Sequence, residues 1–349
     1  MVSIKKLFEP TDMTVGTPWK RILTFSIPLL IGNIAQQLYN TVDSIVVGRY
    51  VGDNALAAVN SSGPVVQLLI SIFMGFSMGG TVVLSNRFGA LDKEGVQKSI
   101  HTSIALTITS GILVTILGVT LTPTILKLVK VDPEVMADSI LYLRLYFAGI
   151  SGLVIYNMGS GLLRAVGDSR SPLYFLIVSS ITNIVLDLLF VVVFKWGIAG
   201  VAIATSIAQF ISAFLIFYKL THTKEMYKLT LTKIGFDMDT LKRIVQIGLP
   251  SALQGSVVSF SNVVVQANIN AFGKIAMAGA GAYHKIDGFA IMPVMSFSHA
   301  MTTFVGQNMG AKKYNRVKQG VKVGLILSCG VNICLSTFIF IFAPQLLSI

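Results

Sequence analysis

Two carboxylates, those of Asp43 and Asp187, lie in stretches of sequence that are otherwise suited to lipid. Asp43 is the only charged residue among the 27 positions between Arg21 and Arg49, and Asp187 is the only one among the 24 positions between Arg170 and Lys195. A charged side chain inside a membrane costs about 3 kcal/mol even on the mildest scale. A proton or a bound cation neutralises a carboxylate in such surroundings, so the chemistry that these residues predict is reversible ion binding.

Amides and hydroxyls accompany both carboxylates at helical spacing. The three stripes are Asn33, Gln36, Asn40 and Asp43; Ser180, Asn183 and Asp187; and Thr205, Gln209 and Ser212. Counted inward from Arg49 and Lys195, the two aspartates and Thr205 lie roughly 9 to 15 Å from the outer membrane boundary, a depth at which they can share one pocket. Hydrogen bonding between helices is the alternative explanation for the amides and hydroxyls.

The composition that surrounds these residues is that of an integral membrane protein. Of 349 residues, 53% are hydrophobic and only 12% are charged, and the mean hydropathy is +0.75. Windows long enough to cross a bilayer run over 22–47, 55–84, 100–121, 140–163, 172–194, 197–218, 244–271, 276–304 and 320–342. We therefore expect an all-α polytopic membrane protein with nine helices in a lipid bilayer.

The net charge of +12 indicates an orientation in the membrane. With the N-terminus inside, twenty Lys and Arg residues fall in inner segments, whereas five fall in outer loops, namely Arg49, Lys127, Lys130, Lys195 and Lys274. The positive-inside rule then predicts a cytoplasmic N-terminus. The basic charge is thus explained without a nucleic-acid partner, and we expect none.

The sequence contains an internal repeat. Lys20-Arg21-Ile22 followed by Pro28 recurs 222 positions later as Lys242-Arg243-Ile244 followed by Pro250, and after one deletion the displacement is 221. A displacement of six helices preserves orientation, which predicts parallel repeats related by an axis along the membrane normal. The expected parts are an N-terminal lobe (1–218), a cytoplasmic basic linker (219–243) and a partial C-terminal lobe (244–349).

The repeat also shows that Asp43 has no acidic counterpart in the second copy, and it predicts more helices than this sequence contains. The position aligned with Asp43 is occupied by Val264 or Val265, so the acidic pair belongs to one lobe only. The second copy ends after its third helix, and a complete pair of repeats has about twelve helices. We therefore expect the chain to be truncated after the ninth helix.

Other motifs favour packing over catalysis. Gly75 and Gly79 form a GxxxG pattern, which most often indicates close helix packing. The sequence has no GxxxxGK[ST] loop, HExxH pair or GxSxG elbow. We expect no catalytic residues, no enzymatic activity and no cofactor other than a coupling ion.

Several stretches together resemble the multidrug and toxic compound extrusion (MATE) transporters, especially the DNA-damage-inducible-like prokaryotic branch. They are Gln36 to Gly48, Gly52 to Ala58, Phe88 to Ala90, Arg164 to Pro172, Gly200 to Thr205 and Gly306 to Ala311. The resemblance implies a bundle of two lobes in a bacterial or archaeal plasma membrane. It further implies a monomer that exports small cationic molecules in exchange for protons or sodium ions.

The resemblance also implies roles for single residues. Asp43, Asn183, Asp187 and Thr205 match coupling-ion residues, with sodium as a possible metal at the two aspartates. The expected supporting or substrate-contacting polar residues are Gln36, Tyr39, Asn40 and Asn157. The resemblance does not itself imply Asn40, which is included because it shares a helical stripe with Asp43. In another branch an acidic residue on the seventh helix binds the cation, whereas this sequence has Gln254 in the corresponding region.

Two alternatives remain open from the sequence. A lipid-linked saccharide flippase of a related family would have a similar helix arrangement, but several basic residues would be expected in its cleft to hold phosphates. The acidic and neutral residues expected in this cleft favour a cationic substrate. A non-transporting fragment is the second alternative, and it follows from the expected truncation.

Overall fold

The computed structural model describes residues 10–128, 131–272 and 274–347, and some side chains within these ranges, among them most of 53–65 and 274–286, are outside the description. The helices are α1 (Pro18–Val46), α2 (Asp53–Gly89), α3 (Lys93–Leu128), α4 (Met136–Ala165), α5 (Arg170–Asp187), α6 (Gly197–His222), α7 (Met238–Ala271), α8 (Lys274–Gly310) and α9 (Tyr314–Leu347). Each predicted window therefore contains a helix. Within the described residues, eight helices are long and apolar enough to cross a membrane, and α7 is not among them.

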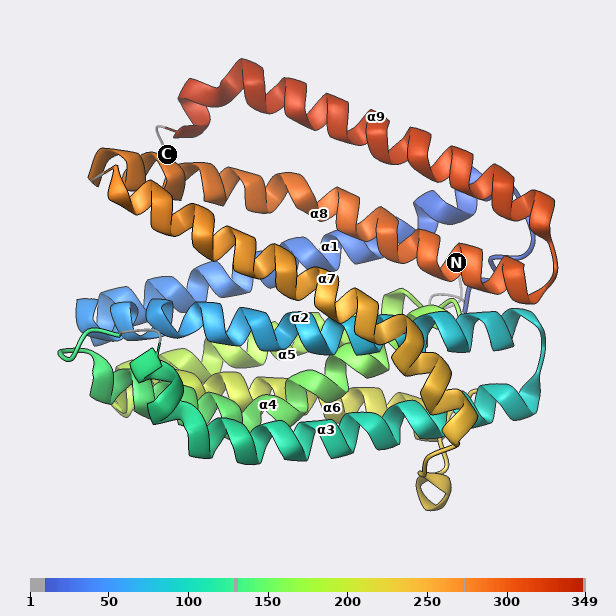
Figure 1. Ribbon diagram of the computed structural model, residues 1–349, viewed down its shortest axis with the longest axis horizontal. Helices are drawn as coiled ribbons and strands as arrows, with labels where there is room; N and C mark the ends of the chain where they lie inside the picture. The colour runs from blue at the N-terminus through green and yellow to red at the C-terminus, as the bar shows by residue number, and fades with distance from the viewer. Residues whose placement is uncertain (1–9, 129–130, 273, 348–349) are drawn as a thin grey trace.

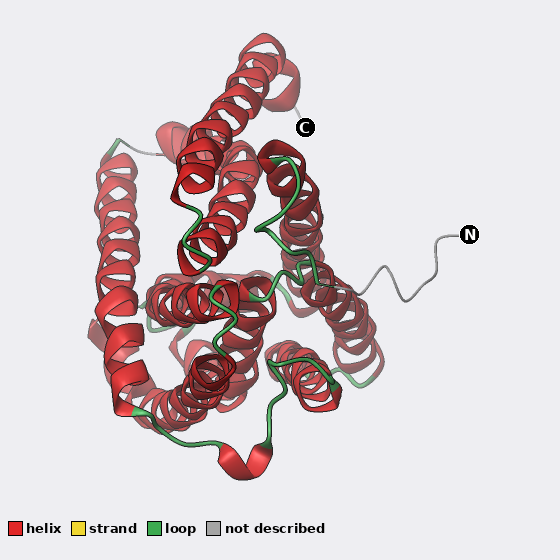
Figure 2. Cartoon of the chain, turned by 90° about the vertical axis from the view of Figure 1, so that its right-hand side faces the viewer, coloured by secondary structure: helices red, strands yellow, loops and turns green. Residues whose placement is uncertain are grey.

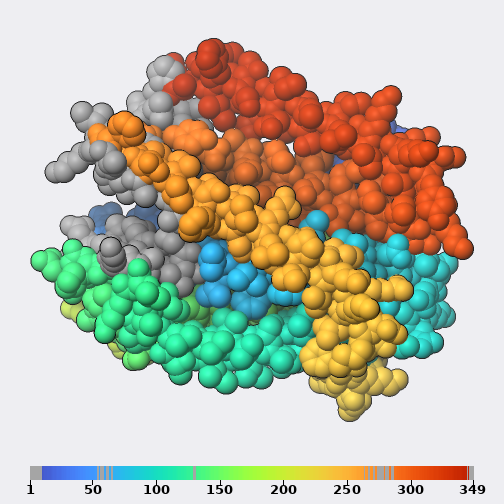
Figure 3. Space-filling view, in the orientation of Figure 1, coloured from blue at the N-terminus to red at the C-terminus, as the bar shows by residue number. Residues whose placement is uncertain are grey.

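The helices run roughly along the long axis of the molecule (Figure 1). Among the first six helices, α4 packs against α2, α3 and α6, and α5 packs between α1 and α6. In the second part, α7 packs mainly against α2, α8 packs against both α1 and α2, and α9 lies outside against α8. In the space-filling view α7 (orange) lies across α2, of which a strip (blue) remains visible beside α3 (Figure 3).

One end of the bundle gathers the segments that precede α1 and α7 and the turns between α2 and α3, α4 and α5, and α8 and α9. We call it the basic end, because these segments and the helix ends that adjoin them carry the Lys and Arg residues that the sequence places inside. Figure 2 looks onto this end, where loops lie across the helix termini.

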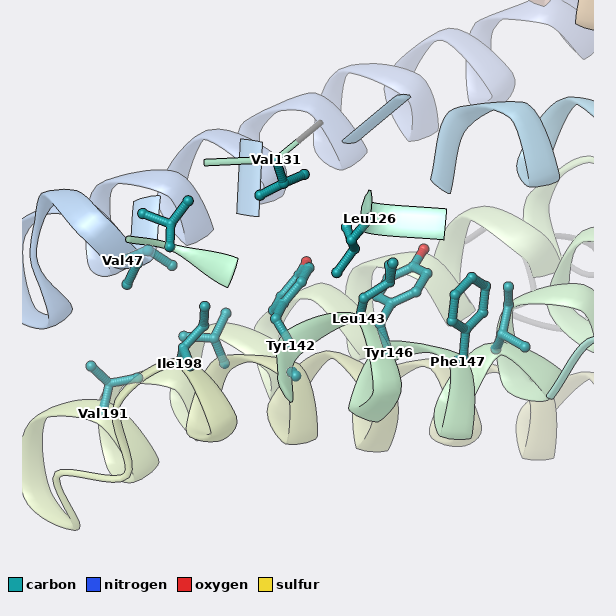
Figure 4. Close-up of a cluster of buried hydrophobic side chains, with 14 of the residues drawn as sticks. Val47, Leu126, Val131, Tyr142, Leu143, Tyr146, Phe147, Val191 and Ile198 are labelled. Atoms are coloured by element: carbon teal, nitrogen blue, oxygen red, sulfur yellow. The ribbon is translucent and has the colours of Figure 1, made fainter. Parts of the chain in front are cut away.

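A cluster of buried apolar side chains fills the other half of the first six helices. Its largest members include Tyr142, Leu143, Tyr146 and Phe147 on α4, which face Val47, Leu126, Val191 and Ile198 from other elements (Figure 4). Because lipid tails are as apolar as these side chains, close packing rather than transfer out of water holds such helices together. The cluster therefore fixes the spacing of α1, α4, α5 and α6 near the predicted carboxylates.

The contact between α2 and α8 at the basic end is reciprocal. Gly89 packs against the backbone of Gln307, and Gly310 packs against the backbone of Asn86. Gly310 and Gln307 are the residues 221 positions after Gly89 and Asn86. A pairing in which i meets j and j meets i is the contact that two parallel repeats related by a two-fold axis produce.

Small residues line the contact between α2 and α7. Gly75 packs against the backbone of Ala252, and Gly79 packs against that of Ile244 and Gly248. The GxxxG pattern is therefore a packing motif, as the sequence predicted. A serine pair also joins these helices, Ser71 Oγ and Ser259 Oγ at 3.1 Å, and in the equivalent contact between α1 and α8 Asn33 Nδ2 donates to Ser296 Oγ at 3.0 Å.

Adding one methyl group to this interface should destabilise the protein. In Gly79→Ala the new Cβ meets backbone atoms of α7 that cannot move aside, and we expect a loss of about 1–3 kcal/mol. Gly63→Ala on the same helix is the matched control, because no atom lies within 4 Å of the added Cβ. Thermal unfolding in detergent should give a lower midpoint for Gly79→Ala only. Equal midpoints would contradict this interpretation of the α2–α7 contact.

Candidate functional site

The two predicted carboxylates meet in the structure. The side chain of Asp43 on α1 contacts that of Asp187 at the end of α5. Asp187 is fully buried and Asp43 is half-buried. The amide of Asn183 joins the same group: in the amide orientation that satisfies both neighbours, its nitrogen lies 2.9 Å from Asp187 Oδ2 and its oxygen accepts from the Thr205 N–H at 3.2 Å. Four residues that the sequence proposed together therefore form one cluster.

The acceptors of this cluster outnumber its donors. Asp43 Oδ1 and Asp187 Oδ1 are both buried without a hydrogen-bond partner. The three ion pairs in the described part of the chain involve Lys98 and Lys219, and neither reaches these carboxylates. Two contacting carboxylates in apolar surroundings repel unless a proton or a cation lies between them. The arrangement can therefore hold one coupling ion.

Aromatic hydroxyls border the cluster. Tyr39 on α1 lies beside Thr205 and, like Tyr142 on α4, lies close enough to both carboxylates to interact electrostatically. Tyr146, also on α4 (Figure 4), stacks on Tyr142 with ring centroids 6.1 Å apart and lies close to Gln209 on α6. These phenols supply polar groups on the side of the site that faces the apolar cluster.

Tyr142 and Tyr146 were not among the residues predicted from the sequence. Their spacing of four puts both phenols on one face of a helix, which is the signal that could have identified them. Tyrosine in a membrane helix also suits an interfacial or packing role, so this signal by itself does not distinguish a site from a core.

The backbone changes geometry immediately after each carboxylate. The α-helical part of α1 ends at Val46, three residues after Asp43, and continues as the π-helical turn η2 (Val47–Val51). α5 ends at Asp187 itself and continues as the π-helical turn η3 (Leu188–Val193). π-Helical turns widen a helix locally and are frequent at functional sites.

The start of α5 is fixed by the turn between α4 and α5. Asp168 Oδ1 accepts from the backbone N–H of Arg170 at 3.2 Å and of Ser171 at 2.9 Å, and Asp168 Oδ2 accepts from the Ser171 hydroxyl at 2.6 Å. Further along, the Ser179 hydroxyl donates to the Ala208 carbonyl of α6 at 2.7 Å. These bonds set the position from which α5 carries Asn183 and Asp187 to α6.

Three of the predicted polar residues lie apart from the cluster. Gln36 and Asn40 are exposed on α1. Asn157 is half-buried on α4, where its Nδ2 donates to the Leu153 carbonyl at 2.9 Å and its carbonyl accepts from the Ser77 hydroxyl at 2.9 Å. The side chain of Asn157 therefore bonds within α4, and only its backbone carbonyl is bonded from α2.

Comparisons with known proteins agree with this architecture. The family model described as MatE matches residues 28–189 and 250–349. The chain is 30% identical to the probable multidrug resistance protein YoeA of Bacillus subtilis over 95% of this chain and 73% of that protein. It is 28% identical to the probable multidrug resistance protein NorM of Thermotoga maritima over 95% of this chain and 72% of that protein.

A solved structure has the same fold. The structure titled as the outward-facing conformation of a multidrug resistance MATE family transporter of the MOP superfamily superposes with a TM-score of 0.89 at 28% identity. The match covers 97% of this chain and 76% of that one. These proteins are transporters, not enzymes. With apolar helices of membrane-spanning length and a family model that matches most of its residues, the chain belongs to the MatE family of multidrug efflux transporters.

Proposed function

We propose that this protein is a secondary antiporter that exports organic cations in exchange for protons or sodium ions. The observation that carries the proposal is the contact between Asp43 and Asp187, each of which keeps a buried Oδ1 atom without a hydrogen-bond donor. A site with too many acceptors and no basic partner binds a cation or a proton. Asn183 and Thr205 orient Asp187, and Tyr39 and Tyr142 border the site.

Exchange follows from competition for the same negative charge. With an ion bound, the two carboxylates no longer repel and α1 closes onto α5. With the ion gone, their repulsion favours separation of the two helices and leaves a negative site for a cationic drug. An ion shifts the equilibrium between two conformations only by as much as its affinity differs between them, and the separation of the two carboxylates supplies that difference.

The setting of this exchange is part of the proposal. The excess of Lys and Arg at the basic end supports a cytoplasmic N-terminus in a bacterial or archaeal plasma membrane. The reciprocal contact between α2 and α8 supports two lobes, 1–218 and 244–349, joined by the linker 219–243. The protein would act as a monomer, with the cleft between its own lobes.

One observation favours an anionic cargo. Arg164, near the end of α4 at the contact with α8, has a buried Nε atom without a partner. Its backbone carbonyl accepts from the Thr303 hydroxyl of α8 at 3.2 Å. A guanidinium that keeps a buried nitrogen without an acceptor, at the contact between the lobes, suits a phosphate or carboxylate, which is the chemistry of a lipid-linked saccharide flippase.

Replacing Asp187 should abolish coupling. In proteoliposomes with an imposed pH or sodium gradient, Asp187→Asn should lower ion-driven transport of a cationic dye at least about tenfold, because the ion loses its charged ligand. Asp132→Asn, an exposed carboxylate in the turn before α4, is the matched control and should transport normally. Wild-type transport by Asp187→Asn would exclude this role.

Drug binding should displace the coupling ion. Adding tetraphenylphosphonium to weakly buffered protein in detergent should release a proton into solution from the wild type, as an indicator dye would measure. Asp43→Asn should release far less, since one carboxylate of the pair is gone. If release occurs only when sodium is absent, sodium competes for the same site. Equal release from both proteins would contradict competition at Asp43.

Arg164 distinguishes the two cargo classes. For an exporter of organic cations, Arg164→Gln should leave cation transport within about twofold of the wild type. For an anionic cargo, the same substitution should remove transport of a phosphate-bearing lipid analogue across the vesicle membrane. Measuring both substrates with both proteins decides between the two functions.

A further inference from the structure

The segment that precedes α1, residues 10–16, lies in a groove formed by α8, α9 and the turn between α4 and α5. We call it the N-terminal strap. Met13 at its centre is fully buried among side chains that include Phe25 and Phe304. The Met13 N–H donates to Gln307 Oε1 at 3.0 Å, and the Met13 carbonyl accepts from Asn308 Nδ2 at 3.0 Å. Met13 is therefore held by both its side chain and its backbone, which a simple connection into a helix does not require.

Arg316 on α9 holds the strap by its backbone. Its guanidinium donates to the carbonyls of Met13 at 3.1 Å and Val15 at 2.9 Å, and also to that of Gly16. The same guanidinium lies 5.3 Å from the ring centroid of Phe304 on α8. Charge-assisted bonds are stronger than neutral ones, and Arg316 makes them to three carbonyls of the strap. It is therefore the main fastening of the strap to α9.

The strap binds both parts of the molecule at once. The Thr11 N–H donates to the Gly167 carbonyl in the turn between α4 and α5 at 2.9 Å. Gln307 on α8 accepts from Met13 and donates from Nε2 to the Ala165 carbonyl of α4 at 2.9 Å. Gly167 has a φ of +94°, and an added Cβ would meet the Thr11 backbone. The first six helices and the α8–α9 pair are thus joined through the seven residues of the strap, which turns at Met13 and Thr14.

The segment before α7 is fastened in a corresponding way. The Asp237 N–H donates to the Thr102 hydroxyl of α3 at 3.0 Å, and Arg87 on α2 donates to the Thr240 hydroxyl at 2.9 Å. Thr240 donates in turn to Asp237, which holds the pKa of that carboxyl below its ordinary value. Arg87 and Asn308 are 221 positions apart, so equivalent residues hold the two segments. Each helix that begins a repeat is anchored to the other repeat.

From this geometry we infer that the N-terminal strap is a latch that must be released before the basic end of the bundle can open. The inference rests on the proposed alternating-access transport. Opening that end separates α2 from α8, and the strap cannot stay bonded to Gly167 on one side and to Gln307, Asn308 and Arg316 on the other. A cavity of about 950 Å³ beside the strap, lined among others by Asp12, Thr14 and Lys313, gives water access to the carbonyls that release would expose.

Spectroscopy on a weakened latch tests the inference. Spin labels at Lys93→Cys and Tyr314→Cys, equivalent exposed positions at the starts of α3 and α9, report the width of the basic end once Cys329 and Cys334 are replaced by Ser. We expect Arg316→Ala to raise the ratio of long to short distances about tenfold. Lys318→Ala, an exposed cation on the same helix, should leave it unchanged. Unchanged distances in Arg316→Ala with a wild-type unfolding midpoint would overturn the latch.

A reversible cross-link separates the latch from the transport function. Lys313 Nζ lies 2.9 Å from the Thr14 carbonyl, so a reducible bismaleimide should join Thr14→Cys to Lys313→Cys. Ion-driven transport should stop on linking, return on reduction, and persist in each single-cysteine variant treated alike. Transport by the linked protein would disprove the latch and leave the antiporter intact. Absence of ion-driven transport in the unlinked protein and in the wild type would instead disprove the proposed function.

Discussion

The contact between Asp43 and Asp187 is the constraint on which the rest of the structure depends. Two carboxyl groups in an apolar bundle require a shared proton or a cation. To bring them together, α1 must lie beside α5, and α5 must be positioned against α6 by Asp168 and Ser179. The apolar cluster around Tyr142 borders this contact and offers the two carboxylates no compensating charge. If the α1–α5 contact is unfavourable without an ion, its stability depends on whether the ion is bound.

α1 connects the contact between Asp43 and Asp187 to the other end of the bundle. Asp43 lies about 40 Å along α1 from Pro18. The N-terminal strap directly precedes this end of α1 and lies between α8, α9 and the turn after α4. The α2–α7 contact is lined by glycine, and a polar pair, Asn33 and Ser296, joins α1 to α8. In the proposed mechanism, α1 is the helix that both ion binding and release of the strap involve.

The helices and the acidic pair followed from sequence because their signals are local. Apolar windows identified nine helices, and Asp43 and Asp187 were conspicuous as single charges in them. Helical spacing and depth were enough to associate Asn183 and Thr205 with Asp187. Gln36 and Asn40 share a helical face with Asp43 in the sequence pattern, but both side chains are exposed in the structure. A helical face is about 100° wide, so the contact between Asp43 and Asp187 covers only part of it and leaves the other polar residues of the face outside the contact.

The sequence by itself determined the membrane class, the repeat, the family resemblance and the carboxylates, since each depends on composition, periodicity or matching residues. Tertiary structure alone decided which polar groups meet. Tyr142 joins the carboxylates through the packing of α4, and Met13 is buried because Gln307 and Arg316, about 300 residues later, bond its backbone. Contacts between backbone carbonyls and distant side chains have no sequence period, so only the packed helices reveal them.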